Sequence, residues 1–197
     1  GVLVDGKSWE RSLNDWRWSL DVNIMGVIHG IRSFVPRMLQ QTKAGRVINT
    51  SSIGGLLGGG AFMAPYQGTK HAITAITESL HAELEMEAAP ISASVLCPGE
   101  VDTGIWQSDR LRDDTEKNVL ASESEQQFHQ AVAQQVAAGL TPDEFARRVF
   151  DEIEKDQFWL LPQEEFRPLF QQRVKSILEK SNPLSMAEMM AAIKQPG

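Results

Sequence analysis

The sequence predicts an α/β fold with a parallel sheet at its centre. Residues 46–51 carry β-branched side chains at three positions, as is typical of a buried parallel strand, and residues 91–97 are predicted to form the next strand. A long helical pattern that begins at Tyr66 lies between the two runs. Strands that alternate with helices favour parallel pairing, so we expect both strands to belong to one sheet.

The first expected element is a long amphipathic helix that follows Ser12-Leu-Asn-Asp15, a stretch with N-cap chemistry. Pro36 is expected to bend or break this helix, and Lys43-Ala-Gly45 separates it from the first strand. One face of the helix is apolar because its hydrophobic residues recur every three or four positions, at Trp16, Leu20, Ile24, Val27, Ile28, Ile31 and Val35.

The second long helix is expected to run from Tyr66 to about Glu87, and Pro90 stops it before the next strand. Pro98-Gly99 then turns the chain at the carboxyl end of that strand. In open α/β sheets ligands bind outside these ends, so the turn is a candidate binding element. The buried stripe of the helix is predicted, from its helical spacing, at Ile73, Ile76, Leu80 and Leu84.

The C-terminal half begins with a polar segment, residues 104–140, whose sparse apolar side chains indicate a lid over the substrate. A helix is expected within it, near 126–138. Thr141-Pro-Asp-Glu144 combines an N-cap residue, a proline at the first helical position and a glutamate at the third, which predicts the start of another helix. Three further elements are expected beyond it: a last strand at 158–162 and helical segments at 166–180 and 185–194.

Length and composition are those of one globular domain, predicted to comprise residues 1–197 with a helical C-terminal extension at 163–197. The formal net charge of −7 argues against nucleic acid or an anionic membrane surface as a partner. No apolar run approaches the ~20 residues that a membrane-spanning helix needs. The only cysteine is Cys97, which is expected to be a small buried hydrophobe. An internal disulfide is thus excluded, and a reducing compartment, the cytoplasm, is expected.

Chemistry is indicated most strongly by the stretch from Ser52 to Lys70. Tyr66 and Lys70 are four residues apart on a predicted helix and therefore share one face. A nearby ammonium stabilises phenolate, so the pKa of Tyr66 is expected to be lowered, as general acid–base catalysis near neutral pH requires. Ser52 ends the preceding strand, where its hydroxyl can hydrogen-bond a substrate oxygen held against Tyr66. A Tyr-x-x-x-Lys pair alone is common by chance. Its position in a helix that follows a strand ending at Ser52 favours a catalytic role.

Two other patterns do not predict a phosphate or metal site. Residues 54–60 are glycine-rich and lie between a strand and a helix, but they lack the Gly-x-Gly-x-x-Gly spacing and the Gly-Lys-Ser/Thr ending of phosphate-binding loops. This loop is expected to line the substrate side of the site instead. His71 and His81 have no acidic partner at metal-ligand spacing, so no metal is expected.

Four motifs together resemble the short-chain dehydrogenase/reductase family: Asn23 in Asp-Val-Asn-Ile-Met-Gly, Ser52, the pair Tyr66 and Lys70, and Pro98-Gly-Glu-Val-Asp-Thr103. They occur in the family's order and at similar spacing over most of the chain. The resemblance implies a Rossmann-like, doubly wound parallel sheet in a three-layer α/β/α arrangement. It also implies that the four side chains form a catalytic tetrad, in which the asparagine lies at a local helix distortion and holds a water that relays protons to the lysine.

The resemblance further implies an oxidoreductase that interconverts a carbonyl and an alcohol with NAD or NADP, on a small-molecule substrate. Self-association through the helices that carry Asn23 and Tyr66 is also implied, giving a homo-oligomer. A non-catalytic nucleotide sensor on the same fold is the alternative, although such relatives tend to lose the tyrosine or the lysine. The implied cofactor contacts are Tyr66, Lys70, Pro98, Gly99, Val101 and Thr103.

The family's glycine-rich phosphate loop has no counterpart in this sequence, which starts at Gly1 where the family's Asn-Asn-Ala-Gly motif would end. We therefore expect the chain to be the C-terminal part of a longer enzyme, preceded by about three βα units. As an isolated chain it is expected to leave the strand at 46–51 with an unpaired edge, to bind nicotinamide cofactor poorly, to be inactive and to aggregate.

Overall fold

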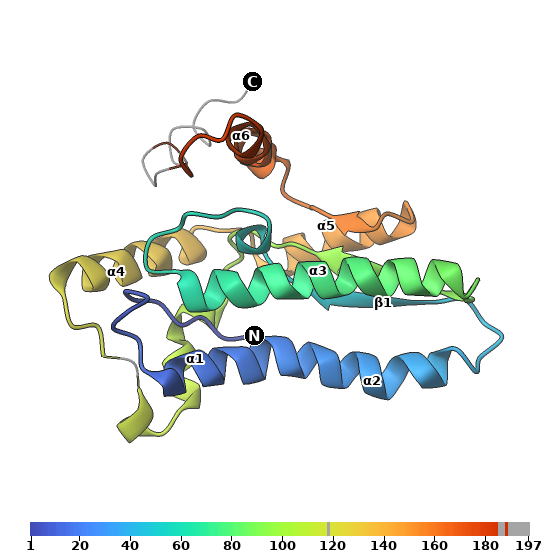
Figure 1. Ribbon diagram of the computed structural model, residues 1–197, viewed down its shortest axis with the longest axis horizontal. Helices are drawn as coiled ribbons and strands as arrows, with labels where there is room; N and C mark the ends of the chain where they lie inside the picture. Colours follow the sequence, from blue (N-terminus) through green and yellow to red (C-terminus); the bar gives the residue numbers. More distant parts are fainter. Residues whose placement is uncertain (118, 185–187, 189–197) are drawn as a thin grey trace.

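The computed structural model describes residues 1–117, 119–184 and 188, and its centre is a parallel sheet in the order β1-β2-β3 (Figure 1). Strand β1 is Gly45–Thr50, β2 is Ile91–Leu96 and β3 is Trp159–Leu160. All six residues of β1 pair with those of β2, whereas β3 pairs only with the last two residues of β2. The predicted parallel α/β class is confirmed, and β1 lies at an edge of the described sheet, as expected.

The first long helix has a distorted turn in its middle. Helix α1 covers Leu13–Leu20, a π-helical turn covers Asp21–Met25, and α2 covers Gly26–Met38. The predicted N-cap is present: the Ser12 side chain accepts a hydrogen bond from the Asp15 N–H, and the Asp15 side chain bonds back to the backbone of Ser12.

The sequence predicts a bend or a break at Pro36, and the break is not found, since α2 continues to Met38. Proline removes only one backbone donor, the one that would bond to the carbonyl four residues earlier, and the donors that follow it remain. The backbone N–H of Leu39 still bonds to the carbonyl of Val35, at 2.9 Å.

Helix α3, Ala64–Met86, packs with α2 on one face of the sheet (Figure 1). The predicted stripe is buried at three of its four positions, and Ile76 is only half-buried. Thr77 takes the buried place beside it, where its hydroxyl accepts a hydrogen bond from Asn49 of β1 at 3.1 Å. The core between these layers consists of Val35, Leu80, Leu84, Ile91 and Ala93.

The remaining predicted helices are present among the described residues, with boundaries shifted by a few residues. Thr141 caps α5 as expected, because its side chain accepts a hydrogen bond from the Glu144 N–H. The helical segment expected at 185–194 lies outside the described residues, apart from residue 188. The other elements are the 3-10 turns Ile53–Gly55, Gly104–Leu111, Asp114–Glu116 and Glu164–Phe166 and the helices α4 Glu123–Ala137, α5 Pro142–Glu154 and α6 Arg167–Leu178.

Helix α4 is tied to the N-terminal segment by a buried ion pair. Glu125, whose side chain is fully buried, contacts the Arg11 guanidinium at 3.5 Å and accepts the Lys7 N–H at 3.0 Å. Although burial opposes its ionisation, hydrogen bonds from Ser122 and Lys7, together with the Arg11 charge, lower the pKa of Glu125 to about 2. The polar segment after β2 is thereby anchored to the start of the chain.

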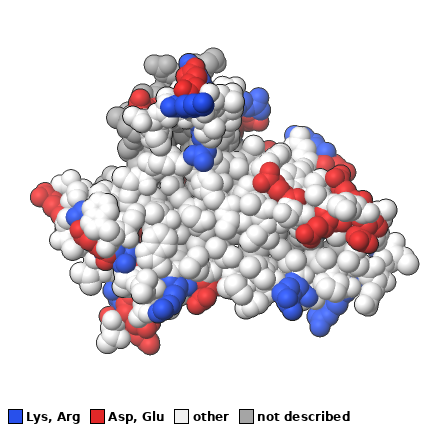
Figure 2. All heavy atoms as spheres, in the orientation of Figure 1, with Lys and Arg blue, Asp and Glu red and all other residues white. Residues whose placement is uncertain are grey.

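Charge is unevenly distributed over the face seen in Figure 2. Acidic side chains gather over the C-terminal part of α3 and over α5. Exposed residues in the first of these regions include Glu78, Glu83, Glu85 and Glu87. Among the described residues, no helix combines the length and the apolar character needed to cross a bilayer.

Candidate active site

The four predicted catalytic side chains come from three elements and are all buried. Ser52 follows β1, Tyr66 and Lys70 lie in the first turns of α3, and Asn23 lies in the π-helical turn. Their exposed fractions are 8%, 8%, 5% and 3%, in that order. The carboxyl ends of β1 and β2, the first turns of α3 and the distorted helix therefore meet at one place.

Ser52 and Tyr66 face one another across Gly54. A Cβ atom built on Gly54 would lie 3.5 Å from Ser52 Oγ and 3.6 Å from Tyr66 Cε1. The hydroxyl of Ser52 accepts the Gly54 N–H at 3.1 Å and donates to the carbonyl of Pro98 at 3.3 Å. Ser52 is thus fixed between the glycine-rich loop and the turn after β2, with its oxygen beside the tyrosine ring.

Lys70 has spare hydrogen-bonding capacity. Its Nζ donates to the carbonyl of Thr50 at 3.1 Å and lies 5.6 Å from the centre of the Tyr66 ring. An ammonium has three N–H donors, and this carbonyl is the one acceptor that the described residues supply to it. Burial lowers the pKa of Lys70 to about 8, and the neighbouring Cys97 thiol opposes this shift. The site therefore holds a buried amine that has room for further oxygen acceptors.

The pKa of Tyr66 differs from the sequence-based expectation. Burial raises it above its ordinary value, and a hydrogen bond with the Ser52 side chain acts in the opposite direction. The expected lowering by Lys70 is not found, because burial of the phenol outweighs the other effects on its pKa. Helical spacing predicts that the two side chains are close to one another, but it does not predict how far each is buried from solvent.

Asn23 uses its whole side-chain amide in hydrogen bonds. Its Oδ1 accepts the Val2 N–H at 2.8 Å, and its Nδ2 donates to the Val2 carbonyl at 2.9 Å and to Thr69 Oγ1 at 3.0 Å. Thr69 in turn donates to the Tyr66 carbonyl at 2.7 Å. The π-helical turn at Asn23, which the family resemblance implied, is thereby connected to the backbone of the tyrosine.

A second polar group, which the sequence analysis did not single out, joins β1 to α3. Ser51 Oγ donates to the Lys70 carbonyl at 2.8 Å and lies 2.9 Å from Thr74 Oγ1. A Cβ on Gly55 would lie only 2.2 Å from Ser51 Oγ, so glycine is required there. The only sequence signals for these contacts are the adjacent pair Ser51-Ser52 and the threonine one helical turn after Lys70.

The turn after β2 lies against the same site. The carbonyl of Pro98 accepts both the Ser52 hydroxyl and the Ile53 N–H, and Val101 forms a parallel bridge with Leu140. Thr103, at the end of the turn, is exposed. All the residues that the sequence analysis proposed for cofactor binding thus follow the carboxyl ends of β2 or start α3.

Other candidate groups do not add chemistry to this site. Cys97 is buried, and burial raises the pKa of its thiol to about 12, against hydrogen bonds from Ser52 and Ser51. A thiol in that state is a poor nucleophile. In the described part of the chain, no three His, Cys, Asp or Glu side chains are grouped so as to hold a metal ion.

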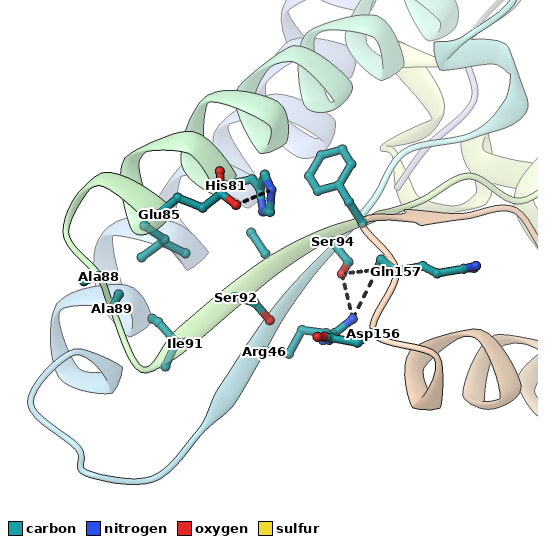
Figure 3. A pocket seen from close by; sticks show the side chains of 13 residues that line it. Arg46, His81, Glu85, Ala88, Ala89, Ile91, Ser92, Ser94, Asp156 and Gln157 are labelled. Atoms are coloured by element: carbon teal, nitrogen blue, oxygen red, sulfur yellow. Dashed lines mark hydrogen bonds and ion pairs between the residues drawn. The ribbon is translucent and has the colours of Figure 1, made fainter.

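A cavity of about 380 Å³ lies at the opposite end of the strands, where β1 and β2 begin (Figure 3). Its ionisable side chains are paired with one another, Arg46 with Asp156 and His81 with Glu85. Arg46 also donates to Ser94 Oγ at 3.1 Å. This cavity contains none of the predicted catalytic residues.

Comparison with known proteins agrees with the fold. A profile described as short chain dehydrogenase matches residues 1–114. A CLA biosynthesis dehydrogenase/reductase of Lactiplantibacillus plantarum is 28% identical over 93% of this chain, and a C alpha-dehydrogenase of Sphingobium sp. strain SYK-6 is 29% identical over 93%. The chain spans 65% and 59% of the lengths of these relatives.

A crystal structure of a short-chain dehydrogenase/reductase from Burkholderia phymatum in complex with NAD superimposes with a TM-score of 0.88 at 34% identity. The superposition covers 94% of this chain and 66% of that one. Fold and comparisons together place the protein among the α/β proteins with a Rossmann-like parallel sheet. Within that class, the chain belongs to the short-chain dehydrogenase family.

Proposed function

We propose that the protein is a nicotinamide-dependent oxidoreductase that interconverts a carbonyl and an alcohol on a small-molecule substrate, with Asn23, Ser52, Tyr66 and Lys70 as its catalytic tetrad. One observation carries the proposal. A serine hydroxyl, a phenol and an amine, all buried, lie together at the carboxyl ends of β1 and β2, where open α/β sheets bind their ligands. The alternative of a non-catalytic sensor is disfavoured by the presence of both the tyrosine and the lysine.

The residues present fit a nicotinamide cofactor, NAD or NADP. Lys70 has N–H donors to spare in a buried position, which suits the hydroxyls of a ribose. The turn that contains Pro98, Gly99, Val101 and Thr103 would hold the nicotinamide end, and Tyr66 would complete that wall. When bound, the cofactor supplies the hydride donor or acceptor, and the protein contributes binding, orientation and electrostatics. The binding of NAD by the relative from Burkholderia phymatum supports this proposal.

Tyr66 acts as the acid or base at the substrate oxygen. In the reductive direction its hydroxyl donates a proton to the oxygen of the carbonyl as that oxygen gains negative charge. The raised pKa keeps the phenol protonated at neutral pH, so the donor is ready in this direction. The Ser52 hydroxyl turns its one proton from the Pro98 carbonyl to the same oxygen and stabilises the developing charge there.

Lys70 and Asn23 resupply Tyr66 with the proton that it donates to the substrate. A pKa of about 8 lets the buried amine exchange protons near neutral pH, beside the tyrosine ring. Asn23 lies on the other side of Lys70: both its Oδ1 and Lys70 Nζ approach within 3.3 Å of a Cβ atom built on Gly1. The distorted turn around Asn23 would hold the water through which protons reach Lys70.

The proposal extends to the domain organisation, the location, the self-association and the substrate class of the protein. A single domain at 1–197 is supported by one sheet with helices packed on it, and a cytoplasmic location by the single buried Cys97. Association of identical chains is supported by exposed apolar side chains on the helix that carries Asn23, among them Val22, Met25 and Phe34. The excess of acidic residues supports a small-molecule substrate rather than nucleic acid.

The test is the substitution Tyr66→Phe in the full-length native protein. Loss of a general acid of this kind lowers turnover by about 10²–10⁴-fold. Affinity for the dinucleotide, measured by titration of its fluorescence, should change little. Ser52→Ala should also reduce turnover, whereas the matched control Ser94→Ala changes a buried serine of β2 that lines the other cavity and should not. Normal turnover by Tyr66→Phe would rule out the proposed role.

A further inference from the structure

The turn after β2 is held by a side chain from a distant part of the chain. Gln163 Oε1 accepts the backbone N–H of Gly99 at 2.7 Å, and Gln163 Nε2 donates to the carbonyl of Glu100 at 3.0 Å. A side-chain amide carries a donor and an acceptor like those of a peptide group. Gln163 therefore pairs with this turn much as a neighbouring strand would.

The position of Gln163 is itself firmly fixed. The residue is only 5% exposed, and it follows β3 directly through Leu161 and Pro162. Three residues later Phe166 packs with Leu169 and with Leu57 of the glycine-rich loop, in a small apolar core of its own. The segment after β3 thus contacts both the cofactor turn and the loop that follows Ser52.

Gly99 is shaped to this contact. A Cβ atom on Gly99 would lie 2.2 Å from Phe166 Cε2 and 3.1 Å from Gln163 Oε1. Glycine is required there because the segment after β3 approaches the backbone so closely. This gives Gly99 a role beyond the cofactor contact proposed from the sequence.

The same turn also fixes Ser52, through the hydrogen bond from its hydroxyl to the carbonyl of Pro98. A shift of the turn would therefore displace the nicotinamide wall and the serine together. We infer that Gln163 is a positioning residue for the cofactor: it fixes the Pro98–Glu100 turn in the shape that receives the nicotinamide. The inference rests on the proposed function, since it assumes that this turn binds a dinucleotide.

The test replaces Gln163 by methionine, which has similar length and no amide. Loss of both hydrogen bonds should weaken dinucleotide binding about tenfold, measured by titration with NADH and with NADPH well below the melting temperature. The effect should be larger on KM for the dinucleotide than on kcat. Gln171→Met is the matched control, because Gln171 is exposed on α6, and it should bind like the native protein.

A second variant covers a failure of the first to fold. Gln163→Glu keeps the shape and the acceptor for the Gly99 N–H but sets a carboxylate oxygen against the Glu100 carbonyl in place of the donor, so its affinity should fall at least as far as that of Gln163→Met. Native affinity in a folded Gln163 variant, even one with a lower melting temperature, would overturn the inference and leave the proposed function standing. Absence of dinucleotide binding by the full-length native protein would overturn both.

Discussion

The burial of Lys70 should cost stability that a methionine at this position recovers. Its pKa is lowered from 10.5 to about 8. At about 1.4 kcal/mol per pKa unit, this shift corresponds to about 3 kcal/mol of destabilisation while the amine is charged. The hydrogen bond from Lys70 to the Thr50 carbonyl offsets about 1 kcal/mol of this destabilisation. Lys70→Met should therefore raise the free energy of unfolding at pH 7 by about 2 kcal/mol, while abolishing turnover.

The gain should depend on pH in a defined direction. Because the folded pKa of Lys70 lies below the unfolded one, the unfolded chain binds more protons between about pH 8 and 10.5, and native stability rises across this window. The advantage of Lys70→Met should therefore shrink as pH rises through the same window. The raised pKa values of Tyr66 and Cys97 lower native stability at high pH in both proteins, and loss of the Lys70 charge raises the pKa of Cys97 further in Lys70→Met.

Urea unfolding of the native protein and of Lys70→Met, without dinucleotide and from pH 7 to 10, measures this difference. Lys43→Met is the control, because Lys43 is exposed and its removal should change stability by no more than about 0.5 kcal/mol at any pH. A Lys70→Met protein that is less stable than the native one at pH 7, or a difference that does not change with pH, would refute the reasoning.

Three further substitutions test the packing around the site. Glu125→Gln leaves the buried Arg11 without its counter-charge and should lower the free energy of unfolding by about 3 kcal/mol at pH 7. Because the pKa of Glu125 is lowered to about 2, this difference in stability from the native protein should become smaller as pH falls below 4.5. Urea unfolding at several pH values would detect the change. Gly55→Ala forces a methyl group against Ser51 Oγ and should cost about 1–3 kcal/mol in urea unfolding as well as turnover, whereas native-like behaviour would contradict the tight contact. Asn23→Ala removes three buried hydrogen bonds and should lower the melting temperature and turnover together, and a fully stable variant would argue against this network.

Local patterns predicted most elements of the fold, and the four candidate site residues lie together in the structure. The β-branched run at 46–51 and the N-caps at Ser12 and Thr141 depend only on neighbours in the sequence, and all three were found. Ser52 and the turn at 98–103 were expected to converge because parallel strands end at the same edge of a sheet, and they do.

What the sequence could not supply depends on contacts between distant residues. The raised pKa of Tyr66 follows from the burial of the phenol, which no spacing reveals. Gln163 meets Gly99 from 64 positions away, so its role has no local signal. Similarly, Thr77 rather than Ile76 is buried because Asn49 of a neighbouring strand offers it a partner.

The central claim is that Tyr66 serves hydride transfer between a nicotinamide cofactor and a carbonyl carbon. The most direct measurement incubates the native protein with reduced dinucleotide that carries deuterium at both C4 positions and with a panel of aldehydes and ketones, and analyses the alcohols by mass spectrometry. The account predicts deuterium on the former carbonyl carbon with the native protein and its near absence with Tyr66→Phe. Alcohol formed without deuterium, or no alcohol at all although the dinucleotide binds, would contradict it.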